Sequence, residues 1–383
     1  MTHLKEHLPL FASHHIVRIG IFIYVSLLFL LLASCGASEE DTLRVAEGNR
    51  YAQGFTLSHT EGKDSSAYLF RSKMRCRFGD TLLLSDTLLV LPHPPKRIVC
   101  LSSTQIPYLK ALGKLGNIVG IAGTRYISDS ALQADITNGS IAEVGTLPNL
   151  DYERLLNLAP DLVLGYDADF TALTNYAHRL RAFKIPVISI DEYHENHPLG
   201  RAEWLKFFAF IFRRDSVATA ILDTVNEAYE RISYSATKSH VPTVLINYPW
   251  KGIWYIPTQE SYMAQFVRDA GGRLLLSSQA ANGNTTATTV SLDEVLSRGF
   301  NAEYWLNLGE IESLGALSNY ENFRAVRNRK VYNNTRRTNT NGGNDFYESG
   351  VLLPHFILRD VYTILHSSGQ DSCAGLYFYK KLE

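Results

Sequence analysis

The sequence predicts an α/β protein of two Rossmann-like lobes with parallel sheets, joined by a single long helix and preceded by a small antiparallel β extension. Three observations carry this prediction. The same order of elements occurs from Pro95 and again from Pro242. It consists of a buried-strand run, a helix, and an acidic helix start before a second buried strand. Strands alternate with helices in each half, which favours parallel sheets covered by helices. One long helical pattern with an apolar stripe, beginning at Asp215, lies between the two halves. A ligand cleft is therefore expected between the lobes.

The first 35 residues indicate an export signal rather than part of the fold. The apolar run Ile19–Leu32, about 14 residues, is short for a bilayer span and fits a signal peptide. It ends in Leu32-Ala33-Ser34-Cys35, which resembles a bacterial lipobox, in which Cys35 becomes the lipid-modified first residue. An ordinary signal peptide with a chance cysteine is the alternative.

Residues 36–94 are expected to form a short acidic tether and a β-rich extension. Runs of strand-forming residues at 44–57, 67–78 and 81–91 are separated by turn signals, which favours antiparallel strands packed on the first lobe. Cys76 and Cys373 would be able to pair in an oxidising compartment, although the sequence does not establish the bridge. Cys100 lies in a buried-strand run and is expected to act as a small hydrophobe.

The N-terminal lobe is expected over 95–199 and the C-terminal lobe over 241–367, with linking helices at 200–240 and an unassigned tail at 368–383. The elements expected in the first lobe are strands at 97–102, 118–122, 162–165 and 186–190 and helices at 104–112, 152–158 and 171–183. The long linking helix follows a strongly apolar one at 202–212. Its apolar stripe is Val217, Ala220, Ile221, Val225, Ala228 and Ile232. A helix about 33 Å long would run along both lobes, and the lobes would then close only slightly on ligand binding.

Composition and motifs argue against nucleic-acid binding and catalysis. The net charge of the 383 residues is −1, which gives no support to nucleic-acid binding. The patterns GxSxG, GxGxxG and HExxH and the P-loop do not occur in the sequence. His194 and His197 have ligand spacing, but nothing else points to zinc at this loop, which is expected at the surface. No enzyme activity, cofactor or protein metal site is expected.

Ligands in open α/β sheets lie outside the carboxyl ends of the strands, so the loops there are expected to line the cleft. The candidate ligand-binding residues are Ser103, Thr104, Arg125, Tyr126, Tyr166, Tyr248, Trp250, Arg336, Asp345 and Phe346. Arg336 and Arg337 would receive carboxylates or catecholates as bidentate donors, or would simply be solvated. Phe346 and Tyr347 would stack on a flat ligand, but packing at a helix start explains them equally well.

Several segments resemble a known family. These are PKRIVCLSS, LDYERLLNLAPDLVLGY, PLGRAEWLKFFA, SYMAQFVRDAGG, VSLDEVL and GGNDFYESG, spread over residues 95–367. They resemble substrate-binding proteins of ABC importers whose lobes are linked by one long helix, in particular lipoproteins from Bacteroidetes. The resemblance implies a ligand such as a ferric siderophore, heme or vitamin B12. Asp345, Phe346 and Glu348 match the vitamin B12-binding members, whereas Leu147 and Ala287 stand where those members have tryptophan. Trp250 and Trp254 would compensate.

The resemblance also implies partners and a location. Glu153 matches the acidic docking position of the first lobe and Asp293 that of the second, with Glu294 beside it. One acidic charge on each lobe would fix the docking register on a cationic permease dimer, which works with ATPase subunits. Acidic residues also favour any helix start, which is the competing explanation. The protein is expected to be a monomer, held by its lipid anchor in the bacterial envelope, at the periplasmic face.

Two alternatives stay open. A surface lipoprotein that captures heme or a corrinoid would share the acidic tether and the two lobes. A chelatase-like two-lobed enzyme would need a buried His/Glu pair and would not carry a lipobox.

Overall fold

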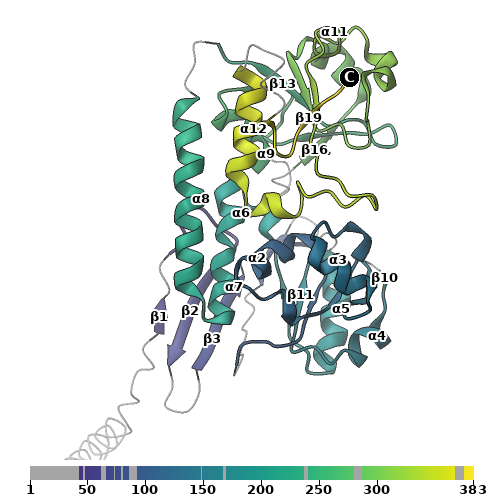
Figure 1. Cartoon of the computed structure of the whole chain (residues 1–383). Coiled ribbons are helices and arrows are strands. Elements are labelled where there is room, and N and C mark those ends of the chain that lie inside the picture. Colours follow the sequence, from purple (N-terminus) through teal and green to yellow (C-terminus); the bar gives the residue numbers. More distant parts are fainter. Residues whose placement is uncertain are drawn as a thin grey trace, which may run out of the picture.

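The computed structural model describes residues 43–45, 48–61, 66–72, 74–78, 81–85, 93–147, 149–166, 170–236, 240–279, 287–366 and 375–383. Two α/β lobes lie one above the other, and a long helix runs beside both of them (Figure 1). The expected signal peptide, Cys35, the acidic tether and the partner cysteine Cys373 lie outside the described residues. Among the described residues, no helix combines the length and apolarity that a bilayer span requires.

The N-terminal lobe is built on a five-stranded parallel sheet in the order β12-β11-β6-β7-β8. Its strands are β6 (Ile98–Cys100), β7 (Ile118–Ile121), β8 (Ala142–Glu143), β11 (Leu162–Gly165) and β12 (Val187–Ser189). The strands are rich in Ile, Val and Leu because helices cover both faces. The helices are α2 (Ile106–Ala111), α3 (Ser130–Thr137), α4 (Tyr152–Asn157) and α5 (Phe170–Ala182), and a small ribbon joins β9 (Gly145–Thr146) to β10 (Asn149–Leu150).

The C-terminal lobe repeats this plan in the order β15-β13-β17-β18-β19. Its strands are β13 (Thr243–Ile246), β15 (Arg273–Leu274), β17 (Tyr304–Leu306), β18 (Val331–Asn333) and β19 (Lys380–Lys381), and only β19 is antiparallel to its neighbour. A separate ribbon pairs β14 (Trp254–Pro257) with β16 (Ala287–Val290). The helices are α9 (Tyr262–Asp269), α10 (Leu292–Arg298), α11 (Arg324–Arg327) and α12 (Pro354–His366). The end of the chain, unassigned in the sequence, is thus an edge strand of this lobe.

Three helices join the lobes, and we call them the spine: α6 (Pro198–Glu203), α7 (Leu205–Phe212) and α8 (Asp215–Ser235). The long helix was predicted, but its buried stripe is shifted by about one residue. Its fully buried residues are Ala218, Leu222, Val225 and Tyr229, whereas Val217, Ile221 and Ile232 are only partly buried. The shift arises because α8 packs on α7 and α12 together, so the buried face is set between two neighbours.

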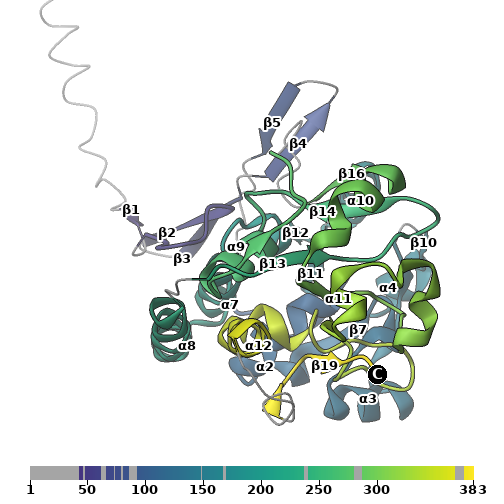
Figure 2. The same ribbon diagram turned by 90° about the horizontal axis from the view of Figure 1, so that it is seen from above.

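The β extension consists of the sheet β1-β2-β3 and the hairpin β4-β5, all antiparallel. The strands are β1 (Leu43–Val45), β2 (Phe55–Glu61), β3 (Ser66–Ser72), β4 (Met74–Phe78) and β5 (Thr81–Ser85), and β4-β5 projects from the body (Figure 2). The antiparallel prediction is correct, but the extension packs on the spine as well as on the first lobe. Glu203 accepts the backbone N–H groups of residues 50–52, and Glu195 accepts those of Gln53 and Gly54.

The residues of the GRAEW segment explain this attachment. An added Cβ at Gly200 would lie 3.1 Å from the Tyr51 carbonyl oxygen, so glycine allows the extension to approach α6 closely. Trp204 packs against Phe55 with ring centroids 4.7 Å apart and donates its indole N–H to Glu195. The loop before α6 is therefore not the surface loop that was expected, because Glu195 is buried beneath the extension.

Short 3-10 helices connect several elements: η1 (Ser103–Gln105), η2 (Leu115–Asn117), η3 (Thr124–Tyr126), η4 (Glu192–His194), η5 (Gly299–Asn301), η6 (Leu314–Tyr320) and η7 (Ser349–Val351). Three of them, η1, η3 and η4, begin just after strands of the first sheet, and η7 leads from the loop after β18 towards α12. They therefore place polar side chains where the two lobes face each other.

Candidate functional site

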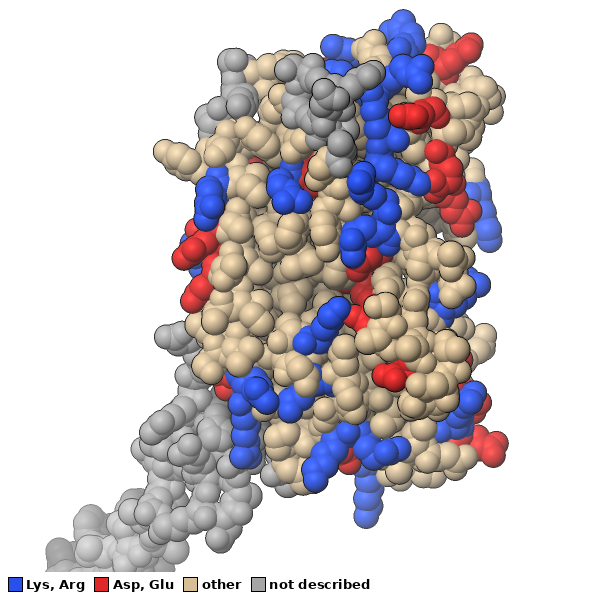
Figure 3. Space-filling view, in the orientation of Figure 1, with Lys and Arg blue, Asp and Glu red and all other residues tan. Residues whose placement is uncertain are grey.

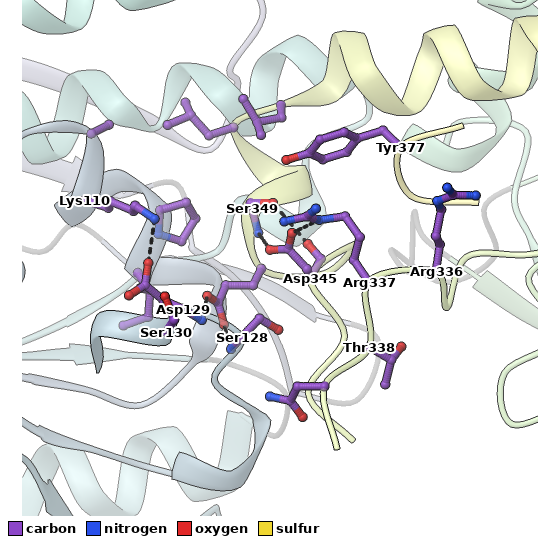
Figure 4. Close-up of a pocket in the computed structure, with 17 residues that line it drawn as sticks. Lys110, Ser128, Asp129, Ser130, Arg336, Arg337, Thr338, Asp345, Ser349 and Tyr377 are labelled. Carbon is purple, nitrogen blue, oxygen red and sulfur yellow. Dashed lines mark hydrogen bonds and ion pairs between the residues drawn. The ribbon is translucent and has the colours of Figure 1, made fainter. Parts of the chain in front are cut away.

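A pocket of about 600 Å³ lies between the lobes. We call it the interlobe pocket. The N-terminal lobe contributes α2 and residues 128–130, and the C-terminal lobe contributes residues 336–339, 345–353 and Tyr377. This volume falls within the range of small-molecule sites, roughly 300–1,000 Å³. Figure 4 shows charged pairs on two sides of this space.

The N-terminal wall of the pocket carries Lys110 and Asp129. The Lys110 ammonium lies 2.6 Å from Asp129 Oδ2, while Asp129 Oδ1 accepts the N–H groups of Ala131 and Leu132 and so caps α3. Burial opposes ionisation of Asp129, but the bonds from Lys110 and Leu132 outweigh it and hold the pKa of Asp129 below its usual value. The carboxylate is thus fully occupied within its own lobe.

The C-terminal wall carries Arg337, Asp345 and Tyr377. Arg337 donates from Nε to Asp345 Oδ2 over 2.6 Å, and its guanidinium carbon lies 4.4 Å from the centre of the Tyr377 ring. Burial acts against the charge of Arg337, but the Asp345 carboxylate more than compensates and raises the pKa of Arg337. Asp345 Oδ1 also accepts the N–H of Ser349. Arg337 is therefore held in place on one edge and one face.

The segment 339–348 of the C-terminal lobe contacts residues 126–129 of the N-terminal lobe, and we call this contact the latch. Glu348 accepts the backbone N–H groups of Ser128 at 2.7 Å and Asp129 at 3.0 Å. Asn339 donates to the Ile127 carbonyl at 2.7 Å. A Cβ added at Gly343 would lie 2.4 Å from the carbonyl oxygen of Tyr126, so only glycine fits. The latch borders the interlobe pocket, to which Glu348 and Asn339 also belong.

A second contact between the lobes involves buried charge, and we call it the Arg201 cluster: Arg201, Glu192, Thr104, Tyr166 and Tyr262. Arg201 Nη2 lies 3.6 Å from Glu192 Oε1, and the guanidinium carbon lies 4.3 Å from the centre of the Tyr262 ring. Burial raises the pKa of Glu192, against the opposing effects of Arg201 and Thr104. Burial likewise raises the pKa of Tyr166. The cluster joins the first lobe, the spine and the second lobe.

The predicted cleft residues of the first lobe occupy two different places. Ser103 and Thr104 begin the short helix after β6, and Thr104 belongs to the Arg201 cluster with Tyr166. The Tyr166 ring lies 5.1 Å from that of Tyr193. Arg125 and Tyr126 lie at the surface and stack on each other, with the guanidinium carbon 4.4 Å from the ring centre. Neither lines the interlobe pocket, although Tyr126 contributes its backbone to the latch.

The predicted cleft residues of the second lobe also lie in different places. Arg336 and Asp345 line the interlobe pocket, with Arg336 at its far edge and apart from the pair of Arg337 and Asp345 (Figure 4). Trp250 is 62% exposed on the turn before β14, outside the lining of this pocket. Tyr248 packs at the edge of an aromatic cluster, 6.3 Å from Trp254.

Two aromatic expectations require correction. Phe346 is only 3% exposed and packs edge-on against Phe378 and Tyr379, so it belongs to the core and does not present its ring to a ligand. Trp254 is fully buried and stacks 5.6 Å from Trp305, so it does not replace a missing cleft tryptophan. Both residues are buried because strands and loops of the second lobe close over them, which sequence spacing did not reveal.

The three docking candidates lie on exposed helix starts. Glu153 is in the first turn of α4, capped by Asp151, and Asp293 is in the first turn of α10, capped by Ser291. Glu153 and Asp293 are exposed, whereas Glu294 is partly covered and pairs with Arg298 one turn on. Both helices lie at the outer surface of their lobes, on the same side of the molecule when seen from above (Figure 2).

Sequence reasoning missed several pocket residues. Lys110 and Tyr377 carried no motif, and Glu348 was noted only as part of the family match. The arginine pair at 336–337 and Asp345 were the available signals for the C-terminal wall. In the part of the chain that the structure describes, no three His, Cys, Asp or Glu side chains converge in a way that would hold a metal ion.

Comparison with known proteins agrees with this geometry. A model of the periplasmic binding protein family matches residues 98–337, more than half of the chain. The chain therefore belongs to the periplasmic binding protein family. Members of this family are binding proteins of the extracytoplasmic space that work with ABC transporters, rather than enzymes.

Individual relatives are distant. An uncharacterized lipoprotein of Methanocaldococcus jannaschii is 25% identical over 301 residues, which cover 74% of this chain and 68% of that protein. A periplasmic heme-binding protein of Vibrio cholerae superposes with a TM-score of 0.54 at 17% identity, over 71% of this chain and 99% of that one. An Fe3+-hydroxamate transport protein of Saccharomonospora viridis superposes with a TM-score of 0.54 at 19% identity, over 73% of this chain and 97% of that one. At these identities the solved structures share the fold.

Proposed function

We propose that this chain is the substrate-binding component of an ABC importer that captures a metal complex between its lobes. The ligand would be a ferric siderophore, heme or vitamin B12, delivered to a permease driven by an ATPase. The observation that carries the proposal is the interlobe pocket, about 600 Å³ and lined from both lobes, in a chain of the periplasmic binding protein family. The named ligands of the distant structures, heme and Fe3+-hydroxamate, support the same class.

Ligand capture is tested by titrating the full-length protein in detergent with hemin, cyanocobalamin and a ferric siderophore. Intrinsic tryptophan fluorescence follows the titration; Trp250 is the exposed tryptophan among the described residues, and the other three are buried. Calorimetry follows the same titrations without depending on a tryptophan. Submicromolar binding of one compound supports the proposal, and binding of none of them contradicts it.

Docking on the permease is the second part of the proposal. Glu153 and Asp293 each place one exposed carboxylate on a separate lobe, as an interaction with two cationic pockets would require. The double charge reversal Glu153→Lys and Asp293→Lys is expected to abolish ligand-stimulated ATPase activity in proteoliposomes, while ligand affinity stays unchanged. Reversal of Glu227, exposed on α8, is the matched control. Unimpaired stimulation by the double variant would refute this docking mode.

Lipid anchoring through Cys35 belongs to the same proposal. The lipobox-like tetrapeptide and the lipoprotein relative support it. The anchor would hold the protein at the periplasmic face, within reach of the permease. A surface-exposed capture lipoprotein is the competing arrangement, and protease accessibility of whole cells separates the two.

A further inference from the structure

Arg337 presents one edge of its guanidinium to the interlobe pocket. Its Nε is bonded to Asp345 and its face lies on Tyr377, which leaves the Nη1 and Nη2 edge as the unused donor side. In the described part of the chain, neither Nη nitrogen has a hydrogen-bond partner. The side chain is 44% exposed, and it lines the pocket. A fixed guanidinium loses little conformational freedom on binding and matches a carboxylate with two parallel bonds.

Apolar side chains also line the pocket that the Arg337 guanidinium faces. Ala111 on the first lobe and Leu353 on the second line the same pocket and are partly exposed, with the buried Ile106 and Leu352 beside them. These apolar side chains would be covered by a ligand with a substantial apolar body, because burying apolar area favours binding. The pocket thus joins one oriented cationic group to an apolar wall.

The three carboxylates that line the pocket are matched in number by three cations. Asp129 is neutralised by Lys110 and by two N–H groups of α3, and Asp345 by Arg337 and the N–H of Ser349. Glu348 accepts two N–H groups across the latch. Arg336 also lines the pocket, at its edge. On the face of the molecule that Figure 3 shows, basic side chains extend down the second lobe with acidic side chains beside them.

We propose that the interlobe pocket takes an amphipathic carboxylic acid, whose carboxylate binds the Nη1 and Nη2 edge of Arg337 and whose apolar body covers Ala111 and Leu353. This inference rests on the proposed function and narrows it from metal complexes in general to those that carry carboxylates.

The test compares hemin, which has two propionates, with hemin dimethyl ester, the same macrocycle without free acids. Cyanocobalamin, whose side chains are amides, is the neutral third probe. Affinities are measured by calorimetry on the full-length protein and on the variants Arg337→Met, Arg337→Lys and Asp345→Asn. Arg327→Met, exposed on α11 far from the pocket, is the matched control, and thermal unfolding checks that each variant is folded.

The proposal expects hemin to bind about 10- to 100-fold more tightly than its ester, the loss expected for hydrogen bonds to a charged group. Arg337→Met should remove this preference, Arg337→Lys should retain only part of it, Asp345→Asn should weaken hemin binding, and Arg327→Met should change nothing. Equal affinity for acid and ester, or binding of neither, overturns the proposal. Tight binding of cyanocobalamin that is indifferent to Arg337→Met also overturns it, but leaves the capture function standing.

Discussion

Two contacts between the lobes, the Arg201 cluster and the latch, differ in how they accommodate charge. At the Arg201 cluster, a guanidinium and a carboxylate are both buried and lie 3.6 Å apart, with Tyr262 of the second lobe over the guanidinium. At the latch, the carboxylate of Glu348 meets backbone N–H groups instead of a cation, next to the pocket.

The difference indicates a division of roles. A buried ion pair is costly to break, because removing one partner leaves the other charge without compensation. The hydrogen bonds that Glu348 accepts can be exchanged for bonds to water when the contact opens, so opening leaves neither the carboxylate nor the N–H groups without a partner. Because Glu192 belongs to the first lobe and Arg201 to the spine, this ion pair fixes the first lobe to the spine. We infer that the latch is the contact that opens between the lobes. The interlobe pocket lies beside the latch, where an opening would admit a ligand.

The largest effect is expected from Arg201→Met. The variant leaves Glu192 buried without its cation, which should lower the free energy of unfolding by about 3–5 kcal/mol. Urea denaturation measures this loss. The double variant Arg201→Met with Glu192→Leu should recover most of it, because replacing both charges by apolar groups removes the uncompensated carboxylate. A single variant as stable as the wild type would contradict the structural role of the cluster.

A smaller and local effect is expected from Gly343→Ala. The new Cβ would lie 2.4 Å from the Tyr126 carbonyl oxygen, so the segment must move away from the first lobe. Amide protection at Ser128 and Asp129 should fall by about tenfold, which corresponds to the net value of roughly one hydrogen bond. Hydrogen exchange measures it. Gly116→Ala, where the added Cβ meets no atom within 4 Å, is the control. Unchanged protection in Gly343→Ala would show that the latch does not depend on close approach.

A third effect is expected from pH. Burial raises the pKa of Glu348 to about 7, and Asp345 and Asp129 add to the rise against the N–H bond from Ser128. Lys110 and Arg337, the nearby cations, are each paired with one of those two carboxylates.

Because the folded pKa of Glu348 exceeds the usual value of 4.5, its stabilising contribution is complete below about pH 4.5 and is lost as the pH rises towards 7. Asp129 has a lowered pKa, so its contribution to the stability is lost as the pH falls, below the range in which Glu348 titrates. Comparing urea unfolding of the wild type and Glu348→Gln between pH 4.5 and pH 8 isolates the effect. Parallel pH profiles for the two proteins would exclude Glu348 as the titrating group.

The fold was predictable where local pattern decides the structure. The strand at Leu162–Gly165, the capped starts of α4 and α10 and the long helix after Arg214 all follow from apolar runs and capping residues within a short window. The apolar stripe of α8 was predicted about one residue out of phase, because two neighbouring helices share its buried face.

The site was predictable only in part, because its residues are brought together by tertiary contacts. Arg336 and Asp345 were found from their loop position, but Tyr377 comes from the segment before the edge strand β19 and Lys110 from α2. Phe346 was placed in the cleft from its neighbours in sequence, and the aromatic rings of residues 378–379 instead bury it. The GRAEW segment was recognised as a family feature, whereas its contacts with residues 50–55 required the structure.

The most direct test of ligand capture beside the latch is hydrogen exchange of the full-length protein with and without a saturating metal complex found by titration. The account predicts increased amide protection in residues 106–111, 126–130 and 336–353, which contribute to the pocket and the latch. Amide protection should change little at residues 50–55, where the β extension packs on the spine. Protection confined to the β extension, or no change in the interlobe segments at saturation, would contradict it.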